Sequence, residues 1–222
     1  MSFVIDAYGN GPDSTTYKAA GAVGYMGYVL GGSTDKHITL AHTRALLAAG
    51  VAVGFVHETG TGDGFGGYNS GYAHARDGLN TATYLLGHPA RCIYLACDTD
   101  TSWASVADYW RGGRDAVGAA RLGVYGPRRV VAGALDAGYA KYGWQPEAWS
   151  SGVDPRVQLH QHTAYVHVGG IECDYNEIRH ADYGQFPFSG SVPVPPVKPP
   201  VVPAVPYDGP WIQNAESAFH MI

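Results

Sequence analysis

The sequence predicts an α/β fold: a small (β/α)8 barrel of the TIM type with short terminal helices, followed by a proline-rich tail. Eight short apolar runs, rich in β-branched and aromatic residues, alternate with helix-like segments over residues 1–186. Strands that are apolar along most of their length indicate a parallel sheet covered by helices. The rival arrangement is a doubly wound open sheet. No Gly-x-Gly-x-x-Gly follows the first run, so a dinucleotide role for that rival has no support.

The elements follow in order along the chain. The apolar runs predict strands at residues 2–6, 24–30, 51–58, 91–98, 121–126, 143–149, 157–163 and 170–176. The segments between them predict helices at 14–22, 37–49, 70–87, 102–120 and 128–140. The links 150–156 and 164–169 are too short for full helices, so we expect the last third of the barrel to be reduced. Pro146 weakens the sixth strand, because proline donates no hydrogen bond to a sheet.

The composition changes sharply near residue 187, because nine of the 14 prolines lie from Pro187 onward. We therefore expect a barrel domain over 1–186 and an extended, semi-rigid linker over 187–210. The remaining residues, 211–222, are too short for a domain. They are either a peptide that docks to another module or protein, or the start of a further module.

Charge and hydropathy exclude several classes of function. The net charge is −5 and only four residues are lysine, which argues against a nucleic-acid partner. No apolar stretch approaches the roughly 18–20 residues of a membrane span. The first residues have no basic segment and reach Asp6 at once, so we expect synthesis in the cytoplasm without a signal peptide.

Acidic residues end several of the expected strands. In a parallel barrel, the carboxyl ends of all strands face one mouth, where catalytic groups lie. An aspartate after a strand is also a common helix cap or turn former, so each acid alone has a structural alternative. Several acids at one mouth instead indicate raised pKa values and acid–base chemistry, as glycosidic-bond hydrolysis needs. The candidates are the acids Asp6, Glu58, Asp98, Asp100 and Asp174, with Tyr125, Trp149 and Gln161 near other strand ends.

Other chemistries gain little support. The glycine-rich loop 59–71 lacks the Gly-Lys-Ser/Thr of a phosphate-binding loop, so we expect a mobile rim whose Tyr68 contacts substrate. His160 and His162 share one face of a strand and are possible metal ligands. Without a third histidine or cysteine at zinc spacing, packing is the simpler interpretation, and we expect no metal and no cofactor. No motif of a serine, cysteine or zinc hydrolase is present.

Six segments, taken together, resemble a known family. They are FVIDAYG, IYLACDTD, LGVYGPRRVV, AWSS, LHQHT and ECDYNEI, spread over residues 2–180. The sequence is similar to the Rv2525c-like glycoside-hydrolase-like domain family, which is related to the glycoside hydrolase family 25 lysozymes. This resemblance implies a barrel that acts on cell-wall glycan such as peptidoglycan. It also fits a wall lysin, including one encoded by a bacteriophage.

The resemblance also implies roles for individual residues. Asp6 and Asp174 match the flanking acids of family 25, and Asp98 matches the first acid of its strand-4 pair. Gln161 and Asn176 match polar residues of the pocket wall. Asp100 falls where the muramidases carry their general-acid glutamate, and aspartate is one methylene shorter.

Three functions remain open. The first is a muramidase-like hydrolase in which Glu58 or Asp100 donates the proton and Tyr125 and Trp149 stack on sugar. The second is a catalytically inactive module that binds cell-wall glycan. The third, with less weight, is a divalent-cation site at the acidic mouth for phosphodiester chemistry.

Overall fold

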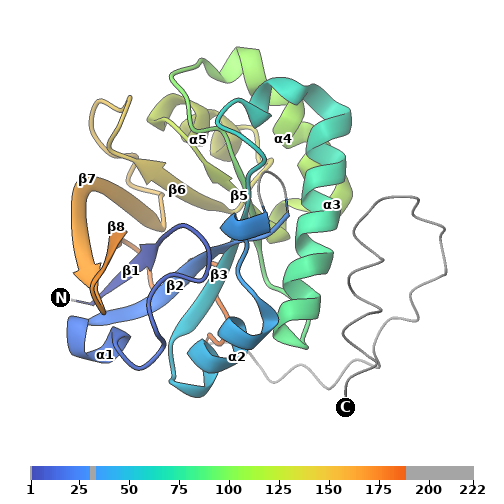
Figure 1. Cartoon of the computed structure of the whole chain (residues 1–222). Coiled ribbons are helices and arrows are strands. Elements are labelled where there is room, and N and C mark those ends of the chain that lie inside the picture. The colour runs from blue at the N-terminus through green and yellow to red at the C-terminus, as the bar shows by residue number, and fades with distance from the viewer. Residues whose placement is uncertain (1, 31–33, 189–222) are drawn as a thin grey trace, which may run out of the picture. The chain divides into compact units, whose positions relative to one another are not determined.

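The computed structural model describes residues 2–30 and 34–188. Eight strands form a closed barrel in which each strand pairs with its neighbour in sequence and the last pairs with the first, as predicted (Figure 1). The strands are β1 (Phe3–Asp6), β2 (Ala22–Tyr28), β3 (Ala52–His57), β4 (Ile93–Ala96), β5 (Leu122–Tyr125), β6 (Tyr142–Pro146), β7 (Leu159–Val168) and β8 (Ile171–Ile178). The proline-rich linker beyond residue 188 and the peptide 211–222 lie outside the described residues.

Helices cover the barrel mainly beside β3, β4 and β5 (Figure 1). Thr39 and Ser102 begin two of them, because each hydroxyl accepts a hydrogen bond from a backbone N–H of the first turn. The first expected helix is reduced to one turn, which ends at Gly21 with a φ of 84°. The helices are α1 (Tyr17–Ala20), α2 (Leu40–Ala48), α3 (Gly67–Leu86), α4 (Trp103–Val117) and α5 (Arg128–Asp136), with 3-10 turns at Thr34–Lys36, Asp63–Gly66 and Ala119–Arg121.

The expectation of an all-parallel sheet is wrong at β8, which runs antiparallel to both β7 and β1. β7 continues to Val168, through the segment expected to be a link, and only Gly169 and Gly170 separate it from β8. Both glycines have positive φ, which suits a two-residue hairpin turn. Two residues cannot make the long crossover that a parallel pair needs, so the chain must reverse.

The long helices α3 and α4 pack closely because glycines stand at their crossing. A Cβ atom added to Gly71 would lie 1.8 Å from the Tyr109 carbonyl oxygen, and one added to Gly112 would lie 2.0 Å from that of Tyr68. The glycines therefore let the two backbones touch. None of the helices in the described part of the chain is long and apolar enough to cross a membrane.

Aromatic side chains fill the interior of the barrel, which accounts for part of the high tyrosine content. Tyr94 and Tyr125 both pack edge-on against Trp144, with ring centroids 5.9 and 4.7 Å away. All three rings are buried. This packed interior closes the barrel, so a ligand can reach only the ends of the strands.

Candidate active site

Asp6 lies at the centre of the candidate site, where β1 ends. Its carboxyl group is fully buried and lies across the strand pair from Asp174. Oδ2 accepts hydrogen bonds from Asn176 Nδ2 at 2.8 Å and from Gln161 Nε2 at 3.0 Å, and Oδ1 lies 3.3 Å from the Tyr28 hydroxyl. Asp174 reaches this mouth because β8 is reversed, so that its first half lies beside the end of β1.

The carboxyl groups of Asp6 and Asp174 influence each other's ionisation. Burial, and then the charge of Asp174, raises the pKa of Asp6 to about 7. Burial also raises the pKa of Asp174, whereas a hydrogen bond from Asp6 lowers it. Asp6 is therefore the protonated donor, and Asp174 is the accepting carboxylate.

Asp98 faces the same mouth, two residues after β4. Its Oδ1 lies 3.2 Å from the Tyr125 hydroxyl, which also lies 2.8 Å from Gln161 Oε1. The single phenol proton serves one of these two acceptors at a time. Burial raises the pKa of Asp98, whereas the hydrogen bond from Tyr125 and the charge of Lys36 oppose that rise. Because the Gln161 amide also donates to Asp6, one hydrogen-bonded chain joins the two acids.

Glu58 follows β3 and is buried in an ion pair with Lys36. Burial raises the pKa of Glu58, and Lys36 opposes that effect. The Lys36 ammonium group also lies 4.1 Å from the centre of the Tyr28 ring. Lys36 and Tyr28 were not among the candidates predicted from the sequence. Tyr28 ends β2 as Tyr125 ends β5, so the argument from strand ends that identified Tyr125 applies to Tyr28 as well.

A pocket of about 320 Å³ opens above these acids. Trp149 stands at its edge with a φ of 56° and 43 % of its surface exposed. Glu58 and Asp6 are buried and do not line the pocket. The lining residues are Tyr28, Asp98, Tyr125, Pro146, Glu147, Ala148, Trp149, Gln161, His162, Thr163, Tyr165 and Asp174.

Two of the expected site residues lie elsewhere. The Asp100 side chain is 62 % exposed and pairs with Arg129, so the structure does not bring it to the pocket. Tyr68 lies on α3, where its hydroxyl donates to Asp115 of α4 at 3.1 Å. Asn176 does reach the candidate site, but it is buried and supports Asp6. Its carbonyl oxygen accepts a hydrogen bond from Trp144 Nε1 at 2.7 Å, and its amide donates a hydrogen bond to Asp6.

The described residues contain two groups of three side chains whose ligand atoms lie close enough to hold a metal ion. One is His57, Asp63 and His74, and the other is His160, His162 and Glu177. The acids of the pocket do not form such a group. The arrangement at the mouth therefore suits proton transfer and charge stabilisation by carboxyl groups.

The family model of the Rv2525c-like, glycoside hydrolase-like domain matches residues 15–178, which include most of the barrel. The chain belongs to this family. A comparison with curated protein sequences finds no match. The family assignment confirms the resemblance inferred from the sequence motifs.

Solved structures support the same fold. The Tat-secreted protein Rv2525c of Mycobacterium tuberculosis, in complex with HEPES, is 29 % identical, with a TM-score of 0.74, over 83 % of this chain and 98 % of that one. The catalytic domain of endolysin ply40 from bacteriophage P40 of Listeria monocytogenes is 14 % identical, with a TM-score of 0.52, over 80 % and 93 %. The modular autolysin LytC of Streptococcus pneumoniae is 14 % identical, with a TM-score of 0.51, over 79 % and 46 %. The two more distant structures share the fold alone.

Proposed function

We propose that this chain hydrolyses the glycan of the bacterial cell wall, in the manner of a muramidase. The observation that carries the proposal is that two carboxyl groups, Asp98 and Asp174, line one pocket, where burial raises the pKa of each and different neighbours contact them. Hydrolysis of a glycosidic bond needs one carboxylic acid to protonate the leaving oxygen. It needs a second, ionised carboxyl group to attack, to activate water or to stabilise the developing positive charge.

Asp98 is the proton donor in this proposal. Burial keeps the pKa of Asp98 above its usual value, and the hydrogen bond from the Tyr125 hydroxyl orients its carboxyl group. Asp174 serves as the ionised partner in this proposal: burial raises its pKa, but the hydrogen bond from Asp6 opposes that rise and stabilises the negative charge. Asp6 is a positioning residue that does not touch the substrate.

Cell-wall glycan is the proposed substrate because exposed aromatic rings border the pocket. Trp149 and Tyr165 are 43 % and 60 % exposed, and such rings pack against the apolar faces of sugars while their polar atoms stay hydrated. The structural relatives include an autolysin solved with a synthetic peptidoglycan ligand, and an endolysin. The place of action is then the bacterial wall, as for a phage-encoded or actinobacterial lysin.

The test uses purified cell walls of several bacterial types and measures new reducing ends between pH 4 and pH 8. We expect Asp98→Asn and Asp174→Asn to lower the rate by at least about 100-fold, since general acid–base catalysis contributes that much. Asp100→Asn is the matched control and keeps the activity. Glu58→Gln separates the two possible donors: a loss as large as that of Asp98→Asn would move the donor role to Glu58. No product from any wall would refute hydrolysis.

A second candidate, an inactive wall-binding module, is favoured by one observation. Asp100, at the position expected for the family 25 general acid, pairs with Arg129 at the surface. This candidate predicts saturable binding to cell walls without cleavage. Such binding would survive Asp98→Asn and would weaken with Trp149→Ala.

A further inference from the structure

The outer face of the β7–β8 hairpin carries two histidines and an acid at one place. His160 and His162 alternate with Gln161, which points into the barrel and contacts Tyr125 and Asp6, so both histidines point outward. Glu177 of β8 is the register partner of His160. Because β8 runs antiparallel to β7, the carboxylate of Glu177 lies beside the two histidines. The sequence alone offered no third ligand for this pair.

The three side chains converge on a common point. Glu177 Oε2 lies 3.7 Å from His160 Nδ1 and 3.6 Å from His162 Nε2. Bonds of about 2.1 Å to one ion, at tetrahedral angles near 109°, place donor atoms about 3.4 Å apart, slightly less than the distances in this structure. All three donors lie within 4.8 Å of one another. The spacing thus fits three ligands of a zinc-sized ion and is too long for direct hydrogen bonds.

Glu147 lies near the second histidine. Its Oε1 is 3.9 Å from His162 Nδ1, which is too far for a direct hydrogen bond but close enough for its charge to act on that nitrogen. Glu147 is itself held by Thr163, whose backbone N–H and hydroxyl lie 2.9 and 3.0 Å from Oε2. A carboxylate near one ring nitrogen favours a proton there and leaves the other nitrogen free to bind a metal, an arrangement found around most metal-bound histidines.

The surroundings of the three ligands decide how an ion can enter. Arg179 Nη1 lies 3.3 Å from both Glu177 oxygens, so a metal that binds Oε2 has to displace the arginine from that oxygen, while Oε1 keeps its contact. His160 is buried, with 6 % of its surface exposed. His162 and Glu177 are about one-third exposed, which leaves a path for an ion.

We propose that His160 Nδ1, His162 Nε2 and Glu177 Oε2 bind one Zn²⁺ or a similar transition-metal ion. Two imidazoles and one carboxylate suit zinc, and three protein ligands leave a fourth position open. The site lies at the edge of the candidate active site, because His162 and Glu147 also line its pocket. The proposal is independent of the hydrolytic function and contradicts the expectation, drawn from the sequence, that the chain binds no metal.

The experiment is calorimetric titration of ZnCl₂ into the full-length chain after dialysis against a chelator. We expect one ion per chain. His162→Ala and Glu177→Gln should each weaken binding at least tenfold, and Glu147→Gln should weaken it by about 10–100-fold. Visible absorption of the Co²⁺ form reports the coordination geometry and should be lost in the His162 variant. Circular dichroism of each variant checks that it folds.

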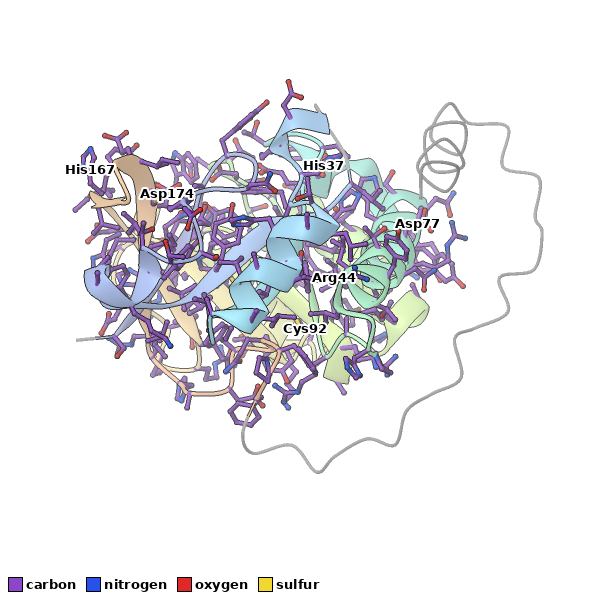
Figure 2. The ribbon with its side chains drawn as sticks, turned by 60° about the horizontal axis from the view of Figure 1, so that its bottom comes forward. His37, Arg44, Asp77, Cys92, His167 and Asp174 are labelled. Carbon is purple, nitrogen blue, oxygen red and sulfur yellow. The ribbon has the colours of Figure 1, made fainter. Side chains whose placement is uncertain are left out.

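A matched control lies on the same hairpin. His167, labelled in Figure 2, faces Glu172 across β7 and β8 at 4.0 Å, but it belongs to neither group of potential metal ligands in the described residues. His167→Ala should therefore leave zinc affinity unchanged. The proposal is overturned if the wild-type chain shows no saturable binding at 100-fold molar excess of zinc. It is also overturned if folded His162→Ala and Glu177→Gln bind as tightly as the wild type, or if His167→Ala removes the binding instead.

Discussion

The raised pKa of Asp6 makes stability depend on pH in a definite direction. Asp6 has a pKa of about 7 in the folded chain, against 3.8 as its ordinary value. Between those values the folded state holds a proton that the unfolded state has lost. The free energy of unfolding therefore falls as the pH rises from about 4 to about 7, and this contribution is constant beyond those limits.

The size of the effect follows from the same two values. At about 1.4 kcal/mol for each pKa unit, the difference corresponds to about 4 kcal/mol. Asp6→Asn removes the titration while keeping the shape, because the amide N–H can donate to Asp174 as the protonated carboxyl group does. Its carbonyl oxygen can still accept from Gln161 and Asn176.

The measurement is urea unfolding of the wild type and of Asp6→Asn, followed by tryptophan fluorescence at pH 4, 5, 6, 7 and 8. Groups that do not contact Asp6 titrate alike in both chains, so their contributions cancel in the difference, and the amide of the variant keeps a hydrogen-bond donor beside Asp174. Relative to the variant, the wild type should lose about 4 kcal/mol between pH 4 and pH 8. A difference that stays constant over this range would show that Asp6 ionises normally, and the assignment of the raised pKa would be wrong.

Three further substitutions test the pocket and the packing. Trp149→Ala should weaken binding to cell walls at least tenfold in a pull-down assay without lowering the melting temperature, because the ring lies at the pocket edge. Trp144→Phe should lower the free energy of unfolding by about 1–3 kcal/mol, because the Asn176 carbonyl oxygen loses its buried donor. Gly71→Ala should cost about 3 kcal/mol or more in urea unfolding, because the new methyl group meets the α4 backbone. Gly60→Ala, where nothing lies within 4 Å, should cost far less.

Local pattern was sufficient for much of the fold. Apolar runs such as 91–98 indicate strands, because a strand that is buried on both faces has no solvent-exposed face that needs polar residues. The same pattern located Asp6 and Asp98 at strand ends, and a strand end fixes which mouth of a barrel a side chain faces. It placed Asp100 among them only by nearness in sequence, and two residues of loop were enough to turn that side chain outward to Arg129.

The direction of β8 depends on the turn that precedes it. The sequence did not predict this turn, because residues 164–169 were expected to be a link between strands. Gly169 and Gly170 make a tight hairpin only once β7 is extended to meet them. Asp174 still lies at the mouth of the barrel. Because β8 is reversed, Asp174 belongs to the first half of that strand and not to its carboxyl end. It also brings Glu177 opposite His160, a contact between strands that spacing along one strand cannot reveal.

The sequence by itself determined the barrel, its family and the acids that end its first strands, because these depend on local polarity and on motifs read in order. Only the tertiary structure decided which acid holds the proton, which acids line the pocket and which histidines find a third ligand. Those properties depend on burial and on distances of a few ångströms between residues far apart in the chain. Such distances are set when the barrel closes and the hairpin packs.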